Sequence, residues 1–136
     1  MTDAVTAALT EQEIGGSSIS LVEWVAPPAP DGKREYVAPF HRHLEDDEAW
    51  YVVEGRMGFY LDGEEIEVGP GGAAMARAGV VHTYWNAGTD VARYVLVMNT
   101  RIRALIAALH DDTLRAGRST AEVFRDHRSE LVDPNA

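Results

Sequence analysis

Four residues in the middle of the chain have side chains of the types that bind metal ions. His41 and His43 lie two positions apart, Glu48 follows them closely, and His82 lies further along the chain. Side chains two positions apart on a β-strand share a face, so the first two imidazoles can converge on one ion. Three imidazoles and a carboxylate suit Zn, Mn, Fe, Co, Ni or Cu and leave coordination positions for water or substrate. An isolated histidine is more often a surface or core residue, so these four indicate a site for one divalent transition metal ion only if their spacing matches a known arrangement.

The residues that carry these side chains have the pattern of short β-strands separated by turns. Asp62-Gly63 between two β-rich runs is a strong signal for a two-residue hairpin, because Gly tolerates a positive φ. Many short strands at regular spacing indicate a sandwich or a barrel, and hence an all-β fold. The expected strands are Ser18–Val25, Glu35–His43, Ala49–Val53, Met57–Leu61, Glu64–Val68, Ala73–Ala76, Val80–Trp85 and Val91–Met98.

The chain changes character after Asn99, where a helical pattern begins. Apolar residues recur there at helical spacing and predict a helix that docks on the barrel; they are Ile102, Leu105, Ile106 and Leu109. Ser119 and Glu122 have the spacing of a capping box, which predicts a second helix through Val123 and Phe124. We also expect a short helix over residues 1–14, with Gly15-Gly16-Ser17 as its hinge. The chain thus divides into an N-terminal segment, 1–17, a barrel, 18–99, and a helical C-terminal extension, 100–136.

Two longer patterns contain the four candidate ligands. His41 to Gly55 has the form HxHx4Ex6G, and Gly71, Gly79, His82 and Asn86 are spaced as in Gx5-(Pro)-xGx2Hx3N. These resemble the two characteristic motifs of the cupin superfamily, in the same order, and the resemblance covers about residues 35–98. It implies a cupin-type β-barrel, or double-stranded β-helix, with His41, His43, Glu48 and His82 as metal ligands.

The sequence departs from the two motifs at positions that are not ligands. Glu35 stands where the first motif usually has Gly, and Arg77 stands where the second usually has Pro, so φ is not fixed at that turn. The acidic run before Glu48 offers an alternative carboxylate. The spacing favours Glu48, and Glu45 or Asp47 would replace it only if the turn were unusual.

The resemblance implies several functions, because cupins with these ligands include dioxygenases, isomerases, lyases, polyketide cyclases and binding proteins. Our first hypothesis is a dioxygenase, similar to small quercetinase-like cupins, that acts on an aromatic or enol-type small molecule. The alternatives are a metal-dependent cyclase or isomerase of natural-product aromatics, and a non-catalytic small-molecule-binding protein.

Two residues are candidates for catalysis. Glu48 is the ligand that can accept a substrate proton as a general base. Tyr84 shares the face of His82 by strand alternation and can present its hydroxyl near the metal. Trp50 has the parity of Glu48 and is expected to line the same cavity, whereas His110 and His127 are expected to be solvated. The remaining aromatic residues of the strands are interpreted as core.

The composition narrows the range of partners and reactions. The 136 residues include no Cys, which excludes thiol nucleophiles and Cys-ligated metal centres. A net charge of -10 argues against nucleic acid as a partner. No stretch is long and apolar enough to span a bilayer and no signal peptide is visible, so we expect a cytoplasmic protein. Strands with apolar residues on both faces, together with the resemblance to dimeric cupins, predict a homodimer.

Overall fold

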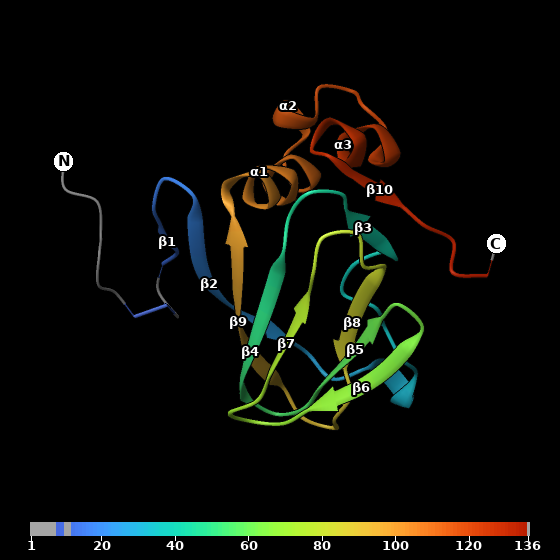
Figure 1. The fold of residues 1–136 in the computed structure, drawn as a ribbon. Coiled ribbons are helices and arrows are strands. Elements are labelled where there is room, and N and C mark those ends of the chain that lie inside the picture. The colour runs from blue at the N-terminus through green and yellow to red at the C-terminus, as the bar shows by residue number, and fades with distance from the viewer. Residues whose placement is uncertain (1–7, 10–11, 136) are drawn as a thin grey trace.

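Two antiparallel sheets form a barrel in the computed structural model of this chain, which describes residues 8–9 and 12–135 (Figure 1). One sheet has the strand order β1-β2-β9-β4-β7 and the other β10-β3-β8-β5-β6. The strands of the first sheet are β1 (Ile14–Gly15), β2 (Ile19–Ala26), β9 (Ala92–Asn99), β4 (Glu48–Glu54) and β7 (Ala73–Ala76). Those of the second are β10 (Ser129–Leu131), β3 (His41–His43), β8 (His82–Asn86), β5 (Met57–Leu61) and β6 (Glu64–Val68). The all-β barrel expected from the sequence is confirmed.

Turn residues determine several of the strand ends. β5 and β6 have the predicted bounds, and the hairpin between them is closed by Asp62 and Gly63, with φ of 49° and 94°. Gly55 ends β4 with φ of 79°, and a Cβ there would lie 2.8 Å from Cα of Ala92. Only glycine fits both requirements, which gives a physical reason for the glycine that ends the first sequence motif.

The strand expected over Glu35–His43 is wrong over most of its length. Only His41–His43 forms regular strand, as β3, while Tyr36 makes an isolated bridge to Trp85. Pro39 lies between these two pairings, and proline has no N–H to donate to a strand ladder. The segment before β3 therefore follows β8 without a continuous ladder.

The barrel interior is filled by the inward-facing residues of both sheets. Alternation along β9 is regular, with Tyr94, Leu96 and Met98 buried between less buried neighbours. Trp50 and Val52 of β4 complete this wall, and Met57 and Phe59 of β5 face it from the other sheet. Their burial supplies the main stabilisation of the barrel that holds the candidate ligands.

The described part of the C-terminal extension, residues 100–135, contains three helices and one strand. α1 (Thr100–Leu109) is capped by the side chain of Asn99 and buries Ile102 and Leu105, as the apolar stripe predicts. α3 (Thr120–Asp126) begins at the predicted capping box. The short helix α2 (Asp112–Arg115) and strand β10 were not expected. Figure 1 shows the helices gathered at one end of the barrel, next to β3.

The N-terminal expectation lies largely outside the described residues, which omit 1–7 and 10–11. The part that is described differs from it, because Ile14–Gly15 pairs with β2 as strand β1. Gly16 donates its N–H to the carbonyl of Ile19 at 2.8 Å, so the expected hinge is the tight turn of this hairpin. None of the helices in the described residues is both long and apolar enough to span a membrane.

Candidate metal centre

The four expected ligands meet inside the barrel. His41 and His43 come from β3, Glu48 from the start of β4 and His82 from the start of β8. One nitrogen or oxygen atom of each lies within 4.8 Å of those of the others, and all four residues are buried. His41 and His82 are cross-strand partners, which aligns β3 with β8 and brings the second motif beside the first. The four side chains singled out by the two sequence motifs therefore lie close together in the structure.

The contacts of the neighbouring acidic residues show which carboxylate faces the imidazoles. Glu45 points outward and forms ion pairs with Arg101 and Arg128. Asp47 accepts a hydrogen bond from the backbone N–H of Ala78 at 2.8 Å. This bond braces the turn in which Arg77 replaces the proline of the motif. Glu48 is left as the carboxylate that faces the imidazoles.

Each histidine has its Nδ1 held by an oxygen outside the cluster. Nδ1 of His41 lies 2.6 Å from the carbonyl of Pro39, and Nδ1 of His82 lies 2.9 Å from the carbonyl of Val80. Nδ1 of His43 lies 2.7 Å from Oγ of Ser129, whose hydroxyl itself donates to the carbonyl of His127. A carbonyl only accepts, and the Ser129 hydroxyl has already donated its own proton, so Nδ1 must carry a proton in all three rings. Nε2 is then the nitrogen of each ring that is available to bind a metal ion.

This donor set fits a cation. Nε2 of His43 and Nε2 of His82 each lie 3.1 Å from Oε1 of Glu48. Lone pairs on nitrogen and a carboxylate oxygen repel one another at this distance unless a proton or a metal ion lies between them. Histidine ligands of metals commonly donate their second nitrogen to a carbonyl or hydroxyl in this way. The cluster can therefore hold a metal ion through three Nε2 atoms and one carboxylate.

The electrostatics of the metal-free cluster keep Glu48 ionised. Burial on its own would raise the pKa of Glu48, but hydrogen bonds from His43 and His82, formed in the metal-free cluster when Nε2 carries a proton, outweigh it and lower the pKa to about 2. Burial also lowers the pKa of His41 to about 3, and neighbouring His82 acts in the same direction. A neutral His41 and an ionised Glu48 are the protonation states that metal ligation requires.

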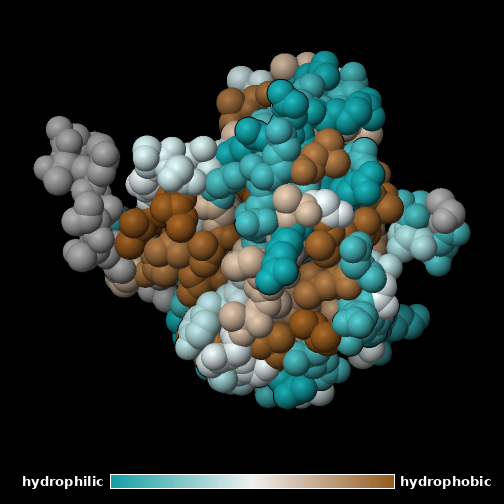
Figure 2. Space-filling model, in the orientation of Figure 1, coloured by the Kyte–Doolittle hydropathy of each residue, from teal (hydrophilic) through white to brown (hydrophobic). Residues whose placement is uncertain are grey.

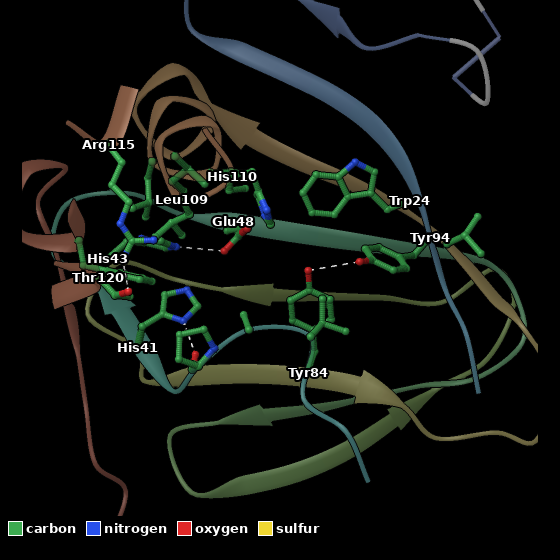
Figure 3. Close-up of a pocket in the computed structure, with 18 residues that line it drawn as sticks. Trp24, His41, His43, Glu48, Tyr84, Tyr94, Leu109, His110, Arg115 and Thr120 are labelled. Atoms are coloured by element: carbon green, nitrogen blue, oxygen red, sulfur yellow. Dashed lines mark hydrogen bonds and ion pairs between the residues drawn. The ribbon is translucent and has the colours of Figure 1, made fainter. Parts of the chain in front are cut away.

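A cavity of about 620 Å³ opens onto the ligand cluster. Its walls come from β2, the segment before β3, and the three helices, and they are mainly apolar. Figure 3 shows Glu48, His41 and His43 on one side of this space and Trp24, Tyr84 and Tyr94 on the other. The helical extension thus forms part of the cavity wall and does more than cover the barrel.

Two tyrosines form a polar pair in this otherwise apolar wall. The hydroxyls of Tyr84 and Tyr94 lie 3.3 Å apart. Burial raises the pKa of Tyr94 to about 12 and that of Tyr84 well above its usual value of 10. Both hydroxyls therefore stay protonated at neutral pH and can donate hydrogen bonds into the cavity. Tyr84 thus lines the same cavity as Glu48, as strand alternation predicts, and Tyr94 joins it.

Three further expectations have mixed outcomes. Trp50 does not line the cavity, because its ring packs in the core between His82, Phe59 and Tyr84. His110 is exposed as expected, yet it lies at the cavity wall. His127 is only partly exposed, and its Nδ1 lies 2.8 Å from the carbonyl of Val123.

Sequence reasoning missed the contributions of the C-terminal extension to the site. Ser129 orients His43 from β10, and Arg115 and Thr120 reach the cavity from α2 and the start of α3. No motif marks these residues. The capping box at Ser119 located α3, but no local pattern shows which face of the barrel the helix covers.

The barrel of two antiparallel sheets with three inward imidazoles and a carboxylate is the arrangement that the two sequence motifs imply. The cupin domain family matches residues 32–98, and this part of the chain is a cupin domain. The comparison with curated proteins gave no match.

Several solved structures are similar to this chain. A protein with a double-stranded β-helix domain from Klebsiella pneumoniae is 20% identical over 71% of this chain and 90% of its own, with a TM-score of 0.59. The polyketide cyclase RemF from Streptomyces resistomycificus is 30% identical over 62% of this chain and 56% of its own, with a TM-score of 0.51. A mutant of the salicylate 1,2-dioxygenase from Pseudoaminobacter salicylatoxidans is 17% identical over 67% of this chain and 25% of its own, with a TM-score of 0.54. The first and third show a shared fold only.

Proposed function

We propose that this chain is a metal-dependent enzyme that acts on an aromatic or enol-type small molecule. The observation that carries the proposal is the cluster of three imidazoles and one carboxylate at the wall of a cavity of about 620 Å³. His41, His43, Glu48 and His82 would hold one divalent ion of Fe, Mn, Ni, Co, Cu or Zn. Such an ion supplies Lewis acidity, which polarises a carbonyl, enol or phenol oxygen of the substrate.

The residues of the chain provide the proton chemistry around that oxygen. Oε1 of Glu48 faces the imidazoles, and its second oxygen is left to accept a proton from the substrate. Tyr84 and Tyr94 remain protonated, so they can donate a hydrogen bond to a second substrate oxygen. The apolar wall from α1 lowers the polarity around these groups, which strengthens their electrostatic interactions. In this proposal Glu48 is the general base and Tyr84 the hydrogen-bond donor.

We propose an oxygen-independent cyclisation or isomerisation as the reaction. Two observations support it over the dioxygenase favoured by the sequence alone. The protonated tyrosine pair suits carbonyl and enol chemistry, and RemF, the similar structure at 30% identity, is a polyketide cyclase. Dioxygenation is the second candidate, because dioxygen is itself apolar and the mainly apolar cavity leads to the ligand cluster.

Product analysis with and without oxygen separates the two reactions. Metal-loaded protein is incubated with a panel of aromatic polyketides, flavonoids and polyphenols, in air and under argon, with the His43→Ala variant as a metal-site control. The cyclase or isomerase proposal predicts the same product and rate under both atmospheres. Conversion in air with matching oxygen uptake would show a dioxygenase instead. Binding of panel members without conversion under either atmosphere would favour a binding protein.

We also propose that the chain forms a homodimer through the outer face of the β1-β2-β9-β4-β7 sheet. Alternate residues of three of its strands point outward and are apolar and exposed: Ile19, Val25, Tyr51, Val53 and Met75. Figure 2 shows hydrophobic residues gathered at the β1–β2 end of this sheet. α1 buries its own apolar stripe at the end of the barrel, so it does not cover this face. A second copy would bury the same patch on both partners.

A further inference from the structure

The cavity wall contains one permanently charged cation. Arg115, at the end of α2, is the only Lys or Arg among the described residues that line the cavity. Figure 3 shows its side chain running from the helix toward Thr120, on the side of the cavity where His41 and His43 lie. It lies outside residues 32–98, which match the cupin domain family.

The guanidinium of Arg115 is held in place but is not saturated. Its Nε donates to the carbonyl of Arg118 at 2.9 Å, and its Nη2 donates to the hydroxyl of Thr120. An arginine has five N–H donors in a planar fork. These two bonds fix the orientation of the fork and leave three donors for a group in the cavity.

Arg115 also differs from most arginines of this chain in having no carboxylate partner among the described residues. Those that do form ion pairs are Arg34, Arg42, Arg56, Arg93, Arg101, Arg103, Arg118 and Arg128. A cation beside a mainly apolar cavity is stabilised by a counter-charge, and here none is supplied by the neighbouring side chains that the structure describes. A bound ligand with a negative charge can supply this counter-charge.

We propose that Arg115 is a specificity-determining residue that binds the carboxylate of an amphipathic aromatic acid in this cavity. That the acid is the substrate rests on the proposed function, because the end of the acid opposite its carboxylate would face the ligand cluster. A planar guanidinium binds a carboxylate through two parallel hydrogen bonds. The net charge of -10 disfavours more highly charged anions and thus a phosphate ester.

Matched ligands and variants test the proposal by calorimetry. The ligands are cinnamate, cinnamyl alcohol and cinnamyl phosphate, which share one apolar body. The variants are Arg115→Gln, which removes the charge, and Arg115→Lys, which keeps the charge without the fork. Arg125→Gln is the control, because Arg125 lies in α3, forms no ion pair among the described residues and does not line the cavity. Each protein is measured both metal-loaded and after removal of metal with a chelator.

We expect the parent protein to bind cinnamate about tenfold more tightly than cinnamyl alcohol. This preference should disappear in Arg115→Gln, fall in Arg115→Lys and persist in Arg125→Gln, in the metal-free protein as well as the loaded one. A different outcome is that the metal-loaded protein shows no activity while the metal-free protein still prefers cinnamate. That combination would overturn the proposed function and leave the carboxylate site supported.

Three results would overturn the carboxylate site. Equal weakening of acid and alcohol in Arg115→Gln would show that Arg115 only braces the α2–α3 connection. Tighter binding of cinnamyl phosphate than of cinnamate would assign the site to phosphate. The absence of measurable cinnamate binding to the parent protein at millimolar concentration would show that there is no such site.

Discussion

Replacing Ser129 with alanine should weaken metal binding while all four candidate ligands stay in place. The hydroxyl of Ser129 lies 2.7 Å from Nδ1 of His43 and keeps that nitrogen protonated. In the metal-free variant, His43 can move its proton to Nε2, where Oε1 of Glu48 accepts it at 3.1 Å. Metal binding would force the proton back to Nδ1, which would have no acceptor in a site that is almost fully buried. The penalty therefore falls on the metal-bound state alone.

The size of this penalty follows from the cost of a buried donor without an acceptor, about 1–3 kcal/mol. We expect the dissociation constant for Zn²⁺ or Co²⁺ to rise about 10- to 100-fold in Ser129→Ala, as for other residues that orient metal ligands. Competition with a chromophoric chelator measures it, and circular dichroism checks the fold. Ser20→Ala is a matched control, because Ser20 is equally buried at 1% exposure and its hydroxyl has no hydrogen-bond partner among the described residues. Equal metal affinity in the two variants would refute the assigned tautomer of His43.

Three other predictions concern the ligands, the base and the assembly. His43→Ala should strongly lower both metal content and thermal stability, because a bound ion stabilises the folded state, whereas His110→Ala should change neither. Elemental analysis measures the metal content and melting curves measure the stability. Equal metal content in both variants would contradict the ligand assignment. Glu48→Gln, reconstituted to full metal occupancy, should still bind an aromatic ligand but lose about 10²- to 10⁴-fold in turnover. Turnover at the parent rate would exclude Glu48 as the general base. Light scattering at micromolar concentration should give a dimer mass for the parent and a monomer mass for Met75→Lys, and a monomeric parent would exclude the interface.

The four candidate ligands could be named from the sequence because they match the two cupin motifs. Strand geometry explains part of that spacing, although His82 rests on the resemblance alone. His41 and His43 share a face on any strand, and the position of Glu48 follows from a short turn. The cavity could not be predicted in the same way. Its walls depend on how the helices after Asn99 fold back over the barrel end, and an apolar stripe such as that of α1 shows that a helix docks but not where. Ser129 illustrates the difference, since its hydrogen bond to His43 joins residues 86 positions apart.

The pairing of β10 with β3 affects the order in which the parts of the molecule fold. Ser129, Glu130 and Leu131 lie opposite His43, Arg42 and His41, so the strand that carries two ligands is covered on one edge by residues near the C-terminal end of this sequence. Closing so long a loop costs more entropy than closing the local hairpins, and contacts of this kind form slowly. During synthesis, the β5–β6 hairpin can form while the chain is still growing, but His43 acquires its orienting hydroxyl only after residue 129 has emerged. We therefore expect the histidine cluster to reach its final geometry as a late folding event, after the rest of the barrel.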